Sequence, residues 1–160
     1  MRRTTALALA CLVTFVLAQV AFAHCQVPCG IYDDGMRCDM IEEHITTIER
    51  AMKSIEHLSG EEKPNSNQIV RWVTTKDAHA QAIQSIASEY FMTQKLKPVA
   101  ETDAAREKYV RQLTILHEML VYAMKAKQTT DLQYVDRLRD VLKTFRAAYF
   151  DDAKAHEHTG

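Results

Sequence analysis

Residues 39–58, DMIEEHITTIERAMKSIEHL, alternate apolar and polar side chains with the period of an α-helix. The large apolar residues recur at spacings of four and three, which places them on one helical face. They are Ile41, Ile45, Ile48, Met52 and Ile55. Ser59-Gly60 follows directly and is a typical helix-ending signal. The stretch therefore predicts an amphipathic helix that buries one face.

Three further segments repeat this pattern, separated by prolines and polar turns. The second runs from a cap at Asn65 or Ser66 to about residue 97, the third follows Pro98 and ends near residue 127, and the fourth follows a cap at Thr130. The residues predicted to face inward are Ile69, Val73, Ala80, Ile83, Ala87 and Tyr90, then Tyr109, Leu113, Leu116, Leu120 and Ala123, then Val135, Leu138, Leu142, Phe145 and Tyr149, with Lys76 interrupting the second stripe.

Short connections between amphipathic helices favour antiparallel neighbours. We therefore expect an all-α protein in which residues 38–160 form an up-down antiparallel four-helix bundle. Residues 24–37 lack helical periodicity and are expected to form an irregular N-terminal segment within the same domain.

The first 23 residues have the composition of a cleaved secretory signal peptide. A positive start at Arg2-Arg3 precedes an apolar stretch over residues 6–20, and AFA at 21–23 is a small-x-small cleavage signal. The apolar stretch is at the lower limit for spanning a bilayer. We expect cleavage after Ala23, a secreted or periplasmic protein, and no stable membrane association after cleavage. A cytoplasmic protein that loses a propeptide is the alternative.

Charge and cysteine content narrow the function classes. Loss of the leader takes the net charge from −1 to −3, because the leader carries two arginines and no acidic residue. A mildly acidic chain is a poor partner for nucleic acid. Three cysteines remain, and an odd number in an exported protein argues against a disulfide scaffold. One of them, Cys38, lies at a predicted helix start and is expected to be unligated.

The histidines of the predicted helices need no functional explanation. They are His44, His57, His79 and His117, and none belongs to the inward Glu-x-x-His pairs of a di-iron bundle. Single helical histidines are usually surface or hydrogen-bonded residues.

Soft metal ligands gather instead in the segment that opens HCQVPCGIYD at residue 24. After cleavage, His24 would supply an α-amine and an imidazole, while Cys25 and Cys29 would supply thiolates. The amine, the amide nitrogen between His24 and Cys25, and the two thiolates can form a planar four-donor set. Such a set suits divalent nickel or copper, whereas zinc prefers a tetrahedron and has no redox chemistry. The segment therefore predicts a site for one-electron cycling.

A disulfide between Cys25 and Cys29 is the structural alternative, and spacing alone favours it in an oxidising compartment. The predicted cleavage immediately before His24 favours the metal, because it would free the His24 α-amine as a ligand. Two other functions remain open from the residues: a noncatalytic exported nickel- or copper-binding protein, and a metal-free helical scaffold.

HCQVPCGIYD closely resembles the HCxxPCGxYD nickel hook that marks the mature N-terminus of nickel superoxide dismutases. Glu89-Tyr90-Phe91 is similar to an acidic-Tyr-Phe stretch of that family. The resemblance implies a four-helix bundle, a homohexamer and one nickel ion per subunit. It also implies an enzyme that disproportionates superoxide to dioxygen and hydrogen peroxide through a Ni(II)/Ni(III) cycle.

The resemblance assigns residues to this site. His24, Cys25 and Cys29 would be the metal ligands, with the His24 imidazole binding the oxidised metal. Tyr32 would guard access to the metal, and Tyr90 would match a second tyrosine of the site.

A family glutamate that orients the hook histidine corresponds to Glu42, with Glu43 as the alternative because the segment before the first helix is longer here. The arginine that supports this glutamate in some members has no counterpart in our alignment, which places residues 76–79 in that region.

Overall fold

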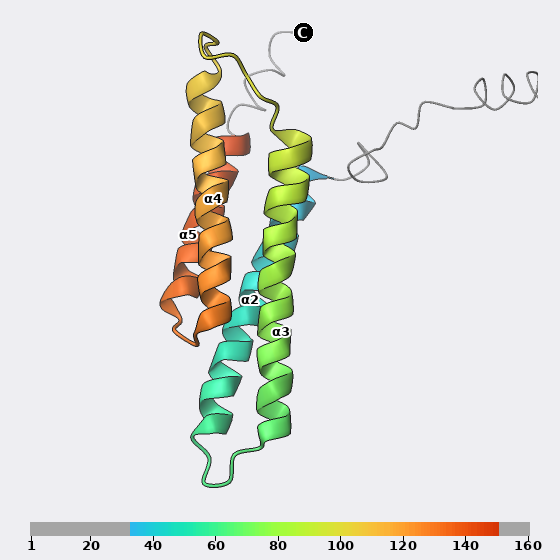
Figure 1. Ribbon diagram of the computed structural model, residues 1–160, viewed down its shortest axis with the longest axis vertical. Coiled ribbons are helices and arrows are strands. Elements are labelled where there is room, and N and C mark those ends of the chain that lie inside the picture. Colours follow the sequence, from blue (N-terminus) through green and yellow to red (C-terminus); the bar gives the residue numbers. More distant parts are fainter. Residues whose placement is uncertain (1–32, 151–160) are drawn as a thin grey trace, which may run out of the picture.

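The computed structural model describes residues 33–150, which form four long helices and no strand. They are α2 (Asp34–Ser59), α3 (Ser66–Ser85), which continues as the π-helix η1 (Ile86–Lys95), α4 (Arg106–Gln128) and α5 (Gln133–Phe150). The chain runs alternately up and down, with α2 beside α3 and α5, and α4 beside the same two helices (Figure 1). The predicted up-down four-helix bundle is confirmed.

The predicted apolar faces form the core. All five predicted residues of α2 are buried, as are Ala80, Ile83, Ala87 and Tyr90 of the second segment and four of the five predicted residues of α5. The buried aromatic residues, Tyr90, Phe91 and Phe145, lie toward the end of the bundle where α2 begins. There Phe91 contacts Phe145 and Tyr149 edge-on, with ring centroids 4.7 and 5.4 Å apart. Edge-to-face aromatic contacts add stability beyond the area that the rings bury.

Helix α2 begins at Asp34, five residues before the predicted start at residue 39. Asp33 caps the helix, because its Oδ1 accepts hydrogen bonds from the backbone N–H groups of Gly35 and Met36 at 2.6 and 3.3 Å. A Cβ on Gly35 would lie only 3.0 Å from that oxygen, so glycine suits this close approach. Residues 34–37, which we expected to belong to the irregular hook, are therefore helical.

Lys76 interrupts the apolar stripe of α3 because it caps the neighbouring helix. Its buried Nζ donates hydrogen bonds to the backbone oxygens of Ala126 and Lys127 at 2.7 and 2.6 Å, satisfying carbonyls at the end of α4.

The α2–α3 hairpin extends past the α4–α5 turn in Figure 1. Val73 precedes Lys76 on α3 and therefore lies beyond the end of α4. It is 38% exposed, so the prediction that it faces inward is wrong.

The predicted caps of the other helices are half correct. Asn65 caps α3 as expected, with Oδ1 accepting from the N–H of Gln68 at 3.2 Å. Thr130 does not cap α5, because its hydroxyl donates instead to Glu56 of α2. Asp131 takes that place, and its Oδ1 accepts from the N–H of Gln133 at 2.9 Å.

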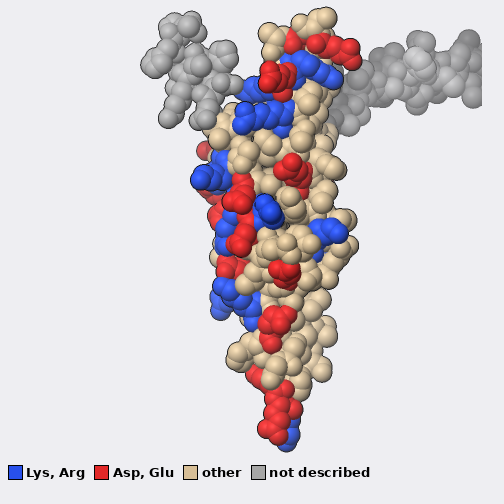
Figure 2. Space-filling model, turned by 90° about the vertical axis from the view of Figure 1, so that its left-hand side faces the viewer, with Lys and Arg blue, Asp and Glu red and all other residues tan. Residues whose placement is uncertain are grey.

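Ion pairs join α2 and α5 along the outside of the bundle. Arg146 lies 2.6 Å from Asp39, and Arg139 lies 2.5 Å from Glu49. Figure 2 shows acidic and basic side chains interspersed over the face that it draws. Among the described helices, none is both long enough and apolar enough to cross a membrane.

Candidate metal centre and its tyrosine cluster

The predicted nickel ligands His24, Cys25 and Cys29, and the hook residue Tyr32, lie outside the described residues. Within residues 33–150 no group of three or more His, Cys, Asp or Glu side chains can hold a metal. The described residues nearest to the hook in the sequence are those at the start of α2.

At that end, Asp34 gathers three side chains from two other helices. Its Oδ1 accepts a hydrogen bond from the Tyr90 hydroxyl at 2.5 Å and lies 2.9 Å from Nζ of Lys95. Its Oδ2 accepts from the Tyr149 hydroxyl at 2.8 Å. We call Asp34, Tyr90, Lys95 and Tyr149 the Asp34 cluster. Antiparallel packing makes this cluster possible, because α2 begins where η1 and α5 end.

The π-helix sets the direction of two members of the cluster. Residues i and i+5 share the hydrogen bonds of a π-helix, as between the N–H of Leu96 and the carbonyl of Phe91 at 2.9 Å. With this wider turn, the consecutive residues Tyr90 and Phe91 are both buried, while Lys95 still reaches Asp34. π-Helical turns are frequent at functional sites. We found no signal in the sequence for this element.

Electrostatics fix the protonation of the Asp34 cluster. Burial alone would raise the pKa of Asp34, but the hydrogen bonds from Tyr90, Lys95 and Tyr149 outweigh burial and lower it. Burial and the bond to Asp34 strongly raise the pKa of both tyrosines. At neutral pH the cluster therefore holds one carboxylate and two protonated phenols.

Two cations lie against the Tyr90 ring. The guanidinium of Arg37 is 5.0 Å from the ring centroid, and Nζ of Lys95 is 5.7 Å from it. Cations attract anions and also interact favourably with the ring face. Sequence reasoning did not locate any positive charge near the site. The antiparallel arrangement of α2 and η1 could have predicted this positive charge. It places Arg37, near the start of α2, and Lys95, at the end of η1, at the same end of the bundle.

Glu42 lies away from this cluster. It is eight residues beyond Asp34 on α2, which corresponds to about 12 Å along the helix axis. Its Oε1 is 3.6 Å from Nε of Arg139 on α5. The cation beside Glu42 is therefore Arg139 of α5, whereas residues 76–79 offered no counterpart of the family's arginine. The contact of Glu42 with His24 that the resemblance implies involves a residue outside the described chain. The alternative residue, Glu43, is exposed on the same helix.

Cys38 is buried in the core, one turn after Asp34. Burial raises the pKa of its thiol to about 11, so the thiol is protonated at neutral pH. A protonated, buried thiol is a poor metal ligand and a poor nucleophile. Among the described residues it is a free cysteine.

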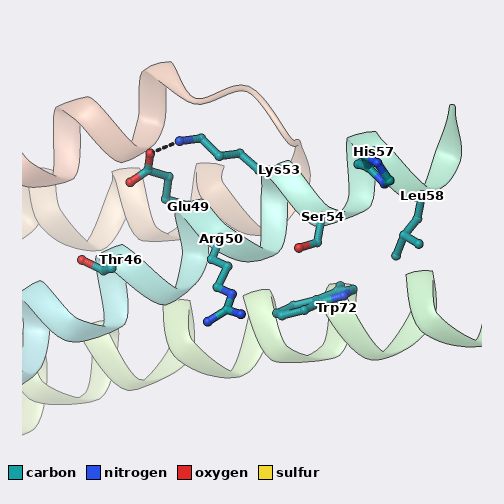
Figure 3. Close-up of a pocket in the computed structure, with 8 residues that line it drawn as sticks. All are labelled: Thr46, Glu49, Arg50, Lys53, Ser54, His57, Leu58 and Trp72. Carbon is teal, nitrogen blue, oxygen red and sulfur yellow. Dashed lines mark hydrogen bonds and ion pairs between the residues drawn. The ribbon is translucent and has the colours of Figure 1, made fainter.

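A pocket lies elsewhere, between the later part of α2 and the start of α3. Its volume is about 560 Å³, and Figure 3 shows its lining side chains Thr46, Glu49, Arg50, Lys53, Ser54, His57, Leu58 and Trp72. None of the predicted site residues lines it. We therefore assign it no part in the metal chemistry.

The donor set that the sequence predicts for the hook would suit nickel. Two thiolates, an amine and an amide nitrogen are ligands that divalent nickel accepts in tetragonal coordination. The end of the bundle where the hook joins contributes phenols, a carboxylate and two cations, which are suited to positioning a small anion.

Comparison with known proteins agrees with this chemistry. The family model of nickel-containing superoxide dismutases matches residues 19–153, which include the hook and all four helices. Neither a curated protein nor a solved structure matches the chain.

Proposed function

Because the chain belongs to the family of nickel-containing superoxide dismutases, we propose that His24, Cys25 and Cys29 hold its nickel ion. The family membership makes the protein a nickel-dependent oxidoreductase that acts on superoxide. The observation that supports the residue assignment is the extent of the match, which includes HCQVPCGIYD together with the bundle.

The α-amine of His24, the amide nitrogen and thiolate of Cys25, and the thiolate of Cys29 would form the donor set. When bound, nickel would supply the one-electron redox chemistry, between its divalent and trivalent states, that the oxidation and reduction of superoxide require. The His24 imidazole would bind the oxidised ion.

The described residues would position the reactants. Tyr90 donates its hydroxyl hydrogen to Asp34, so its phenol is oriented and stays protonated. Lys95 and Arg37 would attract the anionic substrate toward this end of the bundle. Tyr32, two residues before Asp34, would guard access to the metal. We propose that Tyr90 and Tyr32 act by orientation and by controlling water, without binding nickel.

The ligand assignment can be tested by substituting each cysteine. Cys25→Ser and Cys29→Ser should each lose nickel and superoxide dismutation, because each removes a thiolate. Cys38→Ala is the matched control and should keep both, since Cys38 is buried and protonated. Full nickel content in Cys25→Ser would refute the assignment. Nickel binding by the unsubstituted protein without turnover would instead indicate a metal-binding protein.

We also propose that the subunits assemble as a homohexamer. The apolar residues Val70 and Val73 are 61% and 38% exposed. They precede Lys76, which contacts the end of α4, so they lie on the part of α3 beyond that end. Exposed apolar patches are typical of interaction surfaces. Light scattering on the native protein should give six times the subunit mass, and Val70→Glu with Val73→Glu should lower it. A monomeric mass for the native protein would contradict this proposal.

Export is a separate proposal that rests on residues 1–23. Cleavage after Ala23 would place the protein outside the cytoplasm and free the His24 amine in one step. Mass spectrometry of protein from the exported fraction should give a chain that begins at His24. A processed chain found only in the cytoplasm would favour propeptide removal.

A further inference from the structure

His44 on α2 and His79 on α3 face each other across the helix interface. Their Nδ1 atoms are 2.9 Å apart, and their rings meet edge-on with centroids 4.9 Å apart and an interplanar angle of 75°. Both side chains are half-buried. Each is held by a long helix whose neighbouring residues, including Ile45 and Ala80, are fully buried, so the backbones that carry the two rings are rigid.

The separation of these nitrogens matches that of two ligands of one metal ion. Two bonds of about 2.0 to 2.1 Å that meet at a right angle place the nitrogens about 2.9 Å apart, whereas a tetrahedral angle gives about 3.3 Å. The 2.9 Å separation is that of a hydrogen bond between the rings, and it is also the separation that the right angle gives. Square-planar and octahedral ions, such as divalent copper and nickel, bind nitrogen ligands at that angle.

Both Nδ1 atoms can bind a metal ion once the hydrogen between them moves to an outward Nε2 atom. Two imidazoles whose Nδ1 atoms face at this distance share at most one hydrogen between those atoms, because two N–H groups would collide. Burial, and then the charge of His79, lower the pKa of His44, although Glu43 acts in the opposite direction. Neutral imidazole is the form that binds metal.

We propose that His44 and His79 form a second binding site for a divalent first-row transition ion, with copper and nickel preferred to zinc. The described chain offers no third His, Cys, Asp or Glu ligand there, so water would complete the coordination. His44 and His79 lie ten or more residues beyond Asp34 in the sequence and are not among the ligands proposed for the hook, so their ion would be a second one. A site with two protein ligands should exchange its ion readily.

The test uses the full-length mature chain with a silenced hook, His24→Ala, Cys25→Ser and Cys29→Ser, and with the tail histidines replaced, His156→Ala and His158→Ala. Titration with nickel chloride, and separately with copper chloride, should give one ion per chain, with copper bound more tightly. His44→Gln and His79→Gln should each weaken this binding at least tenfold. His57→Gln is the matched control, because His57 is an exposed histidine of the same helix, and it should change nothing.

Electron-spin resonance of the copper form gives a readout that is independent of the variants' folding. The spectrum of the silenced chain should show coupling to two imidazole nitrogens, and His79→Gln should reduce this to one. Equal copper affinity in the silenced chain and in both glutamine variants would overturn the proposal, as would the absence of nitrogen coupling. Neither readout depends on dismutase activity, so the result does not depend on the hook assignment.

Discussion

The Tyr90 hydroxyl donates a 2.5 Å hydrogen bond to Oδ1 of Asp34, and this bond ties the π-helix η1 to the first residue of α2. The same carboxylate accepts from Tyr149 on α5. One aspartate thus joins three helices at the end of the bundle where the hook begins. The bond also keeps Tyr90 protonated. The same contact therefore both packs η1 against α2 and orients the phenol that we propose for the site.

Asp34→Asn should destabilise the protein by about 1 to 3 kcal/mol, because the amide replaces a charged acceptor of two phenols and removes the partner of Lys95. Urea unfolding monitored by circular dichroism measures the loss. Asp39→Asn is the control: its carboxylate pairs with Arg146 but its side chain is 73% exposed, so the cost should be below about 1 kcal/mol. Equal costs would mean that the Asp34 cluster is not a stabilising network.

The stabilisation by Asp34 should depend on pH. Its pKa in the folded chain is lowered from the ordinary value of 3.8, so the folded state binds its proton less readily than the unfolded state. The contribution is therefore fully present above pH 3.8 and is lost as the pH falls through the lowered pKa. The difference in unfolding free energy between the native chain and Asp34→Asn should narrow in acid. A constant difference from neutral pH to well below pH 3.8 would contradict the assigned shift.

Lys76→Met should cost about 2 to 3 kcal/mol, because it leaves the carbonyls of Ala126 and Lys127 without their charged donor while keeping the apolar stem. Thermal or urea unfolding measures this cost. Lys53→Met removes an exposed lysine that pairs with Glu49 on the same helix, and it should change stability by less than about 1 kcal/mol. A neutral Lys76→Met would show that the lysine only fills space.

Tyr90→Phe should lower superoxide turnover several-fold while leaving the nickel content unchanged, since it removes the oriented hydroxyl and keeps the ring. The shape of the pH profile between about pH 6 and 9 should stay the same, because a phenol with a raised pKa does not titrate there. Tyr109→Phe is the control, as Tyr109 lies on α4 outside the Asp34 cluster. Unchanged turnover in Tyr90→Phe would remove Tyr90 from the proposed site.

Cys38 should resist alkylation in the folded protein, because its thiol is buried and its pKa is raised to about 11. The measurement uses Cys25→Ser with Cys29→Ser, in which Cys38 is the remaining thiol of the mature chain. Iodoacetamide at about pH 8 should label it only in denaturant. Rapid labelling of the folded protein would contradict the burial of this side chain.

Helical periodicity predicted the bundle because the buried residues of each helix repeat at spacings of three and four. The same pattern wrongly predicted that Val73 faces inward, since it cannot show where the neighbouring α4–α5 hairpin ends. The start of α2 was missed because Asp33-Asp34-Gly35 reads equally well as a turn. The cap at Asp33 becomes evident only when its carboxylate is seen to accept two backbone hydrogen bonds.

The predicted site divides in a similar way. The ligands His24, Cys25 and Cys29 follow from the chemistry of neighbouring residues and remain predictions, because they lie outside the described chain. The contacts of Asp34 with Tyr90 and of His44 with His79 join residues far apart in the sequence. Each pair lies nearly equally far from the loop between α2 and α3, so an antiparallel hairpin register would have suggested both. The wider turn of the π-helix changes the direction in which its side chains point. A sequence pattern with the 3.6-residue period of an α-helix cannot predict that change.

The measurement that tests the central claim most directly compares two chains that differ by one residue at the N-terminus. One begins at His24 and the other keeps Ala23, and both are loaded with nickel and assayed for superoxide dismutation and metal content. We expect the first to bind about one nickel ion per chain and to turn over rapidly. The second should be inactive, because its His24 nitrogen is an amide and no longer an amine. Full activity of the chain that keeps Ala23 would contradict the proposed ligand set.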